Sequence, residues 1–251
     1  MKDYQKRLAT LLAQSGALLF RQGLRLKDGR PTPYFVNLGV FRTGRLSWEL
    51  GRCFADWFVD QGLAGQVDVL LGPSYKGSAM AQAAAMALHL EHGLDLAFDY
   101  DRKEAKTHGE HAGKAGMFVT GALGPASRAL IIDDVGTSMA TKLELLDKVA
   151  AHFGAEAPRV VGVALAVDRQ QTQAVHDAAG KVVEGARGAD ALAAFGQKTG
   201  LPVWSLLGIR QAAGFLRESG QNVLVEGQWR PLDDELMDRL AQYLAVYGRE
   251  G

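Results

Sequence analysis

The residues of this sequence that could do chemistry lie in three short segments. Asp133 and Asp134 close the apolar run RALIIDDV (128–135), and a loop of small residues (136–138) follows them. Carboxylates in that place can bind sugar hydroxyls or a magnesium ion, and loop amides at a helix start can bind phosphate. Two adjacent negative charges after a buried strand cost free energy unless a ligand or cation compensates them. An Asp helix cap beside a solvated neighbour is the simpler alternative.

A second segment, LLGPSYKGSA (70–79), follows another apolar run. A Gly-Pro turn ends the run and Gly77 opens a helical pattern. Backbone N–H groups at a helix start suit phosphate, and Lys76 adds a positive charge. Taken alone, the segment is more simply explained as an ordinary strand-to-helix turn.

The third segment, YDRKEAKTHGEHAGKAG (100–116), is polar and lies in a chain that is otherwise 47% hydrophobic. Long loops without secondary structure are uncommon unless they act as functional lids. The glycines would let such a loop close over developing negative charge and open again. A solvated surface loop is the alternative. The cationic side chains are Arg102, Lys103, Lys106, His108, His111 and Lys114.

The elements that must position these segments read as a parallel sheet. The runs 67–72, 128–135 and 159–168 are unbroken and not alternating, which is typical of strands covered on both faces. Helical patterns, including 77–92, follow the first two runs. The order predicts an α/β fold with a doubly wound, mostly parallel sheet flanked by helices. Ligands bind beyond the carboxyl ends of such strands, where all three segments fall.

The remaining chain is expected to form one domain, 1–251, with a small N-terminal cap region (1–65), a core (66–217) and a C-terminal extension (218–251). The cap is predicted as a helix at 3–15, one or two short strands within 26–41 and a helix at about 45–62. After residue 170 the patterns predict a hairpin at 174–185, helices at 189–200, 208–219 and 232–248, a strand at 202–208 and a hairpin at 222–231.

Composition excludes several classes of protein. The 28 Lys and Arg balance 28 Asp and Glu, so a bulk nucleic-acid or membrane surface is not expected. The single cysteine, Cys53, allows no intramolecular disulfide and no cysteine-rich metal site, which favours the reducing cytoplasm. The N-terminus reads as a polar amphipathic helix, and no apolar run approaches the roughly 18 residues of a membrane span.

Taken together, the segments resemble the orotate phosphoribosyltransferase family. The matching stretches are LKDGRPTPYFVN (26–37), GPSYKG (72–77), RKEAKTHGE (102–110), IIDDVGT (131–137) and VDRQ (167–170). The loop 102–110 is the most specific, because other phosphoribosyltransferases carry different flaps. The resemblance runs to about residue 170 and more weakly to about 217.

The resemblance implies a type I phosphoribosyltransferase fold and a reaction in pyrimidine (UMP) biosynthesis. Orotate would attack 5-phosphoribosyl pyrophosphate (PRPP), giving orotidine 5′-monophosphate and pyrophosphate, with Mg²⁺ carried by PRPP and no direct protein ligand. Catalytic roles are implied for Lys106, Asp133 and Asp134. PRPP contacts are implied for Lys27, Tyr75, Lys76, Arg102, Lys103, Lys106, His108, Asp133, Asp134, Val135, Gly136, Thr137, Ser138, Met139, Ala140 and Thr141. Orotate contacts are implied for Lys27, Phe35, Val36, Thr137 and Arg169.

The family also implies a homodimer in which each flap reaches over the partner's site. Met139 departs from the family pattern, because glycine is common at that place in the phosphate loop; its side chain must point away for the backbone to approach phosphate. Two other functions stay open: a phosphoribosyltransferase for another nucleobase, and a non-catalytic regulator that senses PRPP.

Overall fold

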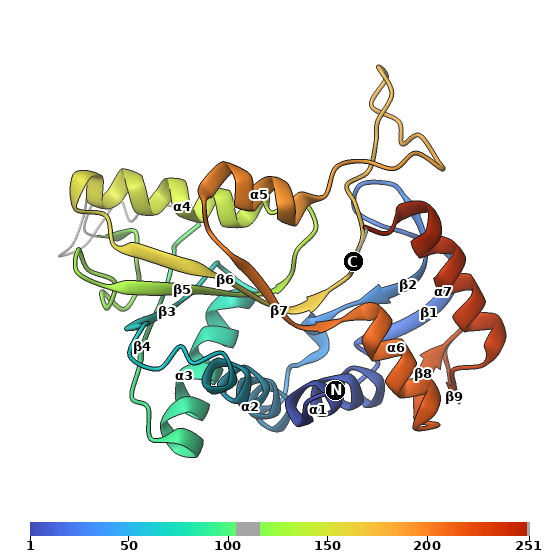
Figure 1. Cartoon of the computed structure of the whole chain (residues 1–251), viewed down its shortest axis with the longest axis horizontal. Coiled ribbons are helices and arrows are strands. Elements are labelled where there is room, and N and C mark those ends of the chain that lie inside the picture. Colours follow the sequence, from blue (N-terminus) through green and yellow to red (C-terminus); the bar gives the residue numbers. More distant parts are fainter. Residues whose placement is uncertain (104–115, 250–251) are drawn as a thin grey trace.

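The computed structural model of the chain, described here for residues 1–103 and 116–249, contains two β-sheets with helices packed around them (Figure 1). One sheet has five parallel strands in the order β4-β3-β5-β6-β7. Its strands are β3 (Val69–Gly72), β4 (Ala97–Tyr100), β5 (Arg128–Val135), β6 (Arg159–Asp168) and β7 (Val203–Gly208). The predicted α/β fold with a parallel sheet is confirmed.

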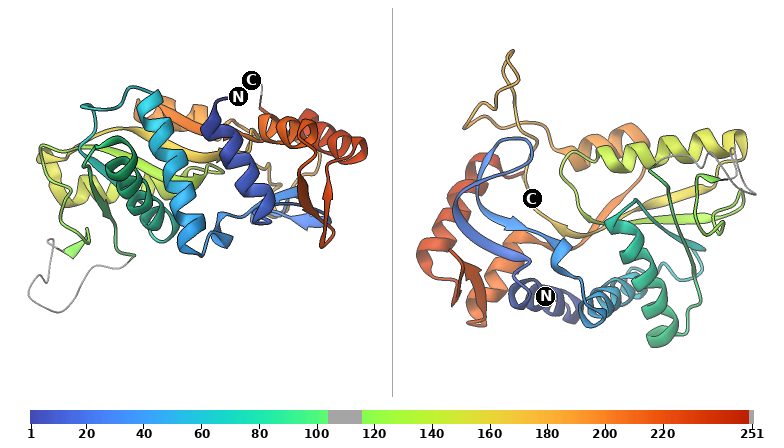
Figure 2. Two further views of the ribbon diagram at one scale, coloured as in Figure 1. Left: turned by 90° about the horizontal axis from the view of Figure 1, so that it is seen from below. Right: turned by 180° about the vertical axis from the view of Figure 1, so that it is seen from behind.

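The helices cover both faces of the five-stranded sheet. α2 and α3 lie on one face with α1 beside them, and α4 and α5 lie on the other (Figures 1 and 2). The helices are α1 (Asp3–Gln14), α2 (Gly44–Asp60), α3 (Lys76–His92), α4 (Ala140–Phe153), α5 (Ala191–Thr199), α6 (Ile209–Glu218) and α7 (Asp234–Tyr247), with short 3₁₀ turns at Leu38–Val40 and Gly154–Glu156. This two-sided cover explains why the central strands are apolar without alternation.

The strand side chains divide between two apolar clusters. Leu70 and Leu130 are fully buried in the cluster built with α1, α2 and α3. Their neighbours Leu71 and Ile131 are fully buried in the cluster built with α4 and α5. Each buried leucine or isoleucine contributes about 1.5–3 kcal/mol of transfer free energy, so the strands are held firmly at both faces.

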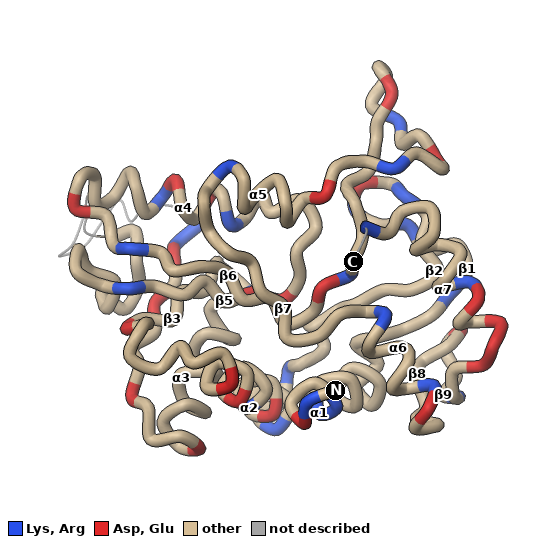
Figure 3. Tube along the Cα trace, viewed as in Figure 1, with Lys and Arg blue, Asp and Glu red and all other residues tan. Residues whose placement is uncertain are grey.

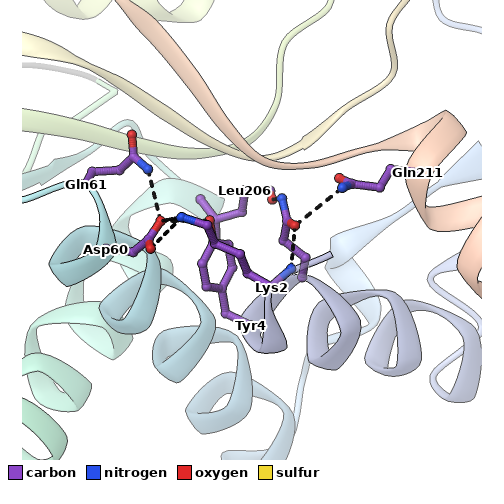
Figure 4. Close-up of polar contacts among 7 residues, drawn as sticks. Lys2, Tyr4, Asp60, Gln61, Leu206 and Gln211 are labelled. Atoms are coloured by element: carbon purple, nitrogen blue, oxygen red, sulfur yellow. Dashed lines mark hydrogen bonds and ion pairs between the residues drawn. The ribbon is translucent and has the colours of Figure 1, made fainter.

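Polar contacts fix α1 against α2 and β7 (Figure 4). The Lys2 ammonium and the Tyr4 hydroxyl, the latter at 3.4 Å, both contact the Asp60 carboxylate at the end of α2. The Gln5 amide donates to the Leu206 carbonyl of β7 at 3.0 Å. These contacts join the N-terminal helix to the core sheet that carries the candidate site.

The second sheet combines both ends of the chain. β1 (Leu18–Arg25) pairs antiparallel with β2 (Pro31–Val36) and parallel with β8 (Asn222–Val225), which pairs with β9 (Gln228–Pro231). β1 begins well before the stretch 26–41 in which cap strands were expected, and β4 was not expected at all. The segment between β6 and α5 stands away from the core sheet at the top right of Figure 1.

Charged residues of both signs are interspersed along the described trace (Figure 3). This agrees with the formal net charge of zero. Among the described residues, no helix is both long and apolar enough to cross a membrane.

Candidate active site

The loops that follow β3, β5 and β6 share one edge of the core sheet. These three strands are adjacent and parallel, so their carboxyl ends lie side by side. From β3 the chain passes to β4, which flanks β3 toward one edge of the sheet, and then to β5, which flanks β3 toward the other edge. The strand order therefore reverses between β3 and β5, and doubly wound folds bind ligands at such a topological switch point. The acid pair, the turn 72–77 and Arg169 are thus brought to one place.

The loop after β5 ends in a left-handed residue. Met139 has φ 59° and ψ 6° and precedes the first turn of α4. Its carbonyl accepts from the backbone N–H of Lys142 at 3.0 Å and of Leu143 at 3.1 Å. The side chain is only 2% exposed and packs in the cluster beneath α4 and α5. Methionine therefore occupies the conformation that favours glycine, with its side chain in the core rather than in the loop.

The two carboxylates of the acid pair have different surroundings. Asp133 is buried against the ammonium of Lys142, and its Oδ1 accepts from the Asp134 backbone N–H at 2.9 Å. Burial raises the pKa of Asp133, and the Lys142 ammonium opposes this rise. Asp134 Oδ2 accepts from Lys76 Nζ at 2.8 Å. The structure therefore compensates both negative charges with lysines, one of them buried and one about half exposed.

Lys76 brings the turn after β3 against the acid pair. Close packing shapes this turn: a Cβ on Gly72 would lie 2.1 Å from the Gly77 carbonyl oxygen. The Ser74–Tyr75 peptide bond is cis. The Tyr75 ring is 76% exposed, with Lys103 Nζ 5.6 Å from its centroid. Lys103, a cation of the polar segment, therefore lies beside the turn 72–77.

The two ends of the polar segment are pinned together. Asp101 forms an antiparallel bridge with Phe118, and the Arg102 N–H donates to the Met117 carbonyl at 2.8 Å. Asp101 Oδ1 accepts from the Ser74 N–H at 2.7 Å, and its other oxygen contacts the Lys148 ammonium of α4. Residues 104–115, with the predicted Lys106 and His108, lie outside the described residues.

Arg169 follows β6 and is 5% exposed. Its guanidinium carbon lies 5.8 Å from the centre of the Tyr34 ring and 6.0 Å from that of Phe35. Within the described part of the chain, its buried Nε and Nη2 have no hydrogen-bond partner. Three other arginines in the described ranges have one such nitrogen, and Arg169 has two, which makes it the candidate for contact with an anionic or carbonyl-bearing ligand.

The predicted site residues of the N-terminal cap lie on β2 and on the turn before it. Val36 is 6% exposed and packs in the core, so only its backbone can face a ligand. Lys27 is exposed in the turn between β1 and β2. Arg30 and Asp28 fix that turn against the segment after Arg169: Arg30 Nη1 donates to the Thr172 carbonyl at 2.8 Å, and the Asp28 carbonyl lies 3.2 Å from His176 Nε2.

Three charged residues that the patterns did not single out support this site. Lys142 and Lys148 occur in a helical pattern where lysines are usually solvated, yet Lys142 is 4% exposed and holds Asp133. Arg30 is fully buried. Helical periodicity does not predict these contacts, because Lys142 pairs across a loop with Asp133, and the partners of Lys148 and Arg30 lie much farther along the chain.

Over residues 1–103 and 116–249, no three His, Cys, Asp or Glu side chains gather into a metal-holding group. Both carboxylates of the acid pair already contact lysines. Cys53 is buried, and burial raises the pKa of its thiol to about 12, so it is a packing residue and not a nucleophile.

Two relatives named orotate phosphoribosyltransferase align with most of this sequence. The orotate phosphoribosyltransferase of Thioalkalivibrio sulfidiphilus is 37% identical over 248 residues, covering 99% of this chain and 100% of that protein. That of Chromohalobacter salexigens is 37% identical over 219 residues, covering 86% and 84%. The chain belongs to the orotate phosphoribosyltransferase family. No family model matches it.

Solved structures of orotate phosphoribosyltransferases share the fold. The crystal structure from Francisella tularensis has a TM-score of 0.72 at 26% identity and covers 95% of this chain and 98% of that one. The Mycobacterium tuberculosis enzyme in complex with PRPP has a TM-score of 0.54 at 22% identity, covering 83% and 98%, and shows likeness of fold alone. The orotate phosphoribosyltransferase fold therefore extends across residues that the sequence resemblance left unmatched after 217.

Proposed function

We propose that the protein transfers the 5-phosphoribosyl group of PRPP to orotate, giving orotidine 5′-monophosphate and pyrophosphate in pyrimidine biosynthesis. The observation that carries this proposal is the position of Arg169. Its Nε and Nη2 lack a hydrogen-bond partner in the part of the chain that the structure describes, and its guanidinium carbon lies 6.0 Å from the centre of the Phe35 ring, at the same sheet edge as the acid pair. An anionic aromatic base would satisfy the buried donors and contact the ring.

The PRPP half of the site would be formed by the loops after β3 and β5. Loop 137–141 leads into α4, where its N–H groups and hydroxyls would hold the 5′-phosphate. Asp133 and Asp134 would accept hydrogen bonds from the ribose hydroxyls. Lys76, whose side chain is about half exposed, would turn from Asp134 to the pyrophosphate.

Bond cleavage at the anomeric carbon passes through an oxocarbenium-like state, so the ring gains positive charge while pyrophosphate gains negative charge. Asp134 would stabilise the first charge and Lys76 the second. Lys103, beside Tyr75, would add a cation from the root of the flap. Lys106 and His108 would complete the flap. Mg²⁺, bound to the pyrophosphate of PRPP, would neutralise part of the leaving group's charge.

The same proposal includes a homodimer with shared active sites. Two features of the described surface support it: Met86 and Leu90 lie one turn apart on α3 and are 50% and 64% exposed. Exposed apolar side chains of this kind often mark subunit contacts.

Residues 1–251 would form one domain, because α1 contacts the core strand β7 and also β8 of the second sheet. The buried, unpaired Cys53 supports a cytoplasmic location.

The test follows orotate absorbance with purified protein, PRPP and Mg²⁺, with uracil, adenine and hypoxanthine as parallel bases. Loss of the orotate signal only when every component is present is the expected result. Turnover of another base instead of orotate would favour a phosphoribosyltransferase of different specificity. PRPP binding without turnover of any base would favour a regulator.

A further inference from the structure

The last turn of α7 and the residues after it form a short strap over the segment that carries Arg169. Gln171 and Gly248 form an antiparallel bridge. The Thr172 N–H donates to the Tyr247 carbonyl at 2.8 Å, and the Arg249 N–H donates to the Gln170 carbonyl at 3.0 Å. We call residues 243–249 the C-terminal strap.

Glycine allows the chain to leave the helix at this point. A Cβ on Gly248 would lie 2.1 Å from the Leu244 carbonyl oxygen. Gly248 keeps a 2.9 Å hydrogen bond from its own N–H to that carbonyl while its backbone is already extended. The strap is thus a direct continuation of α7.

Side chains of the strap hold both sides of Arg169. On one side, the Arg249 guanidinium forms an ion pair with the buried carboxylate of Asp168. On the other, the Tyr243 hydroxyl donates to Gln171 Oε1 at 3.0 Å, in a buried hydrogen bond. Asp168, immediately before Arg169, and Gln171, two positions after it, are therefore both fixed by the C-terminal strap.

The Tyr243 ring also reaches the aromatic wall beside Arg169. It meets the Tyr34 ring edge-on, with centroids 5.9 Å apart, and the Tyr34 hydroxyl donates to the Arg169 carbonyl at 3.1 Å. In the described structure Arg169 Nε and Nη2 make no hydrogen bond of their own. The direction of this side chain is therefore set by its backbone and by neighbouring rings.

We propose that Tyr243 and Arg249 are positioning residues for base recognition, acting through Gln171 and Asp168 on Arg169. This inference rests on the proposed function. A guanidinium that donates two parallel hydrogen bonds to a planar anion binds that anion much less tightly when it is displaced by about 1 Å. The loops after β3 and β5 are anchored separately, by Lys76 and Lys142, so the strap affects the base and not PRPP.

The test uses the full-length protein and the variants Tyr243→Phe and Arg249→Gln. Tyr247→Phe is the matched control: its hydroxyl accepts from the Gly185 N–H at 2.8 Å, while its backbone carbonyl still serves Thr172. The measured quantities are KM for orotate, KM for PRPP, kcat, and the ratio of kcat/KM for orotate to that for uracil.

Each of the two strap variants is expected to raise KM for orotate by about tenfold and to lower the orotate-to-uracil ratio, with KM for PRPP unchanged. Tyr247→Phe should leave all four quantities near wild type. Arg249→Lys should restore most of the orotate KM, because it keeps the positive charge beside Asp168.

Equal changes in KM for both substrates, or the same changes in Tyr247→Phe, would overturn the positioning role and leave the strap as a stabilising element only. Unchanged orotate KM in both strap variants, with an active wild type, would overturn it while the proposed function stands. A wild-type protein that does not consume orotate would overturn both.

Discussion

Met139 gives the most specific stability prediction, because it combines a left-handed backbone with a buried side chain. Met139→Ala removes most of the side chain from the core, at a cost of about 2–5 kcal/mol, and keeps a Cβ in the unfavourable conformation. Met139→Gly loses the same contacts but removes the steric cost, about 1–2 kcal/mol for a left-handed L-residue. Glycine's greater chain entropy in the unfolded state offsets roughly 0.5–1 kcal/mol of that gain.

Both Met139 variants should therefore be less stable than wild type, with Met139→Gly more stable than Met139→Ala by about 0.5–1 kcal/mol. The exposed helical position Glu144 of α4 is the control. There the alanine variant should exceed the glycine variant by about 1 kcal/mol. Free energies of unfolding from urea titration give both differences. An alanine advantage at Met139 equal to that at Glu144 would refute the left-handed conformation and its role in the loop.

Three further predictions concern the loops of the site. Gly72→Ala should weaken PRPP binding and lower the free energy of unfolding by about 2 kcal/mol or more, because the added Cβ would overlap the Gly77 carbonyl. Titration calorimetry that gives wild-type PRPP affinity for this variant would contradict the prediction. Lys142→Met should cost about 3–5 kcal/mol near pH 8. That deficit should shrink as the pH falls, because burial raises the pKa of Asp133 and protonation removes the uncompensated charge; a pH-independent deficit would contradict the pairing. Lys106→Ala should lower kcat by about 10²–10³-fold with an unchanged melting temperature, and near-normal turnover would exclude it from the flap's catalytic role.

The core of the fold could be predicted because its signals are local. The runs 128–135 and 159–168 match β5 and β6 residue for residue, since strands buried on both faces must be continuously apolar. Helices α3 and α7 begin and end within two residues of their predicted bounds. The small-residue loop after Asp134 was recognisable for the same reason, because strand end, loop and helix start are contiguous.

Features that depend on distant pairing were not predictable. β1 (Leu18–Arg25) is mostly partly or fully exposed after Phe20, and it owes its strand state to β2 and to β8, some two hundred residues away. The burial of Lys142 depends on Asp133 across a loop, and the C-terminal strap depends on a bridge between Gln171 and Gly248. Neither periodicity nor spacing carries that information.

The central claim is that the buried guanidinium of Arg169, whose Nε and Nη2 have no hydrogen-bond partner among residues 1–103 and 116–249, recognises the base at a site that also binds PRPP. The most direct measurement compares kcat/KM for orotate, and KM for PRPP, between wild type and Arg169→Gln. The account predicts a fall of about 10²-fold or more in kcat/KM for orotate with KM for PRPP near wild type, because charge-assisted hydrogen bonds to the base are lost and the PRPP loops are intact. Wild-type efficiency with orotate in Arg169→Gln would contradict the claim.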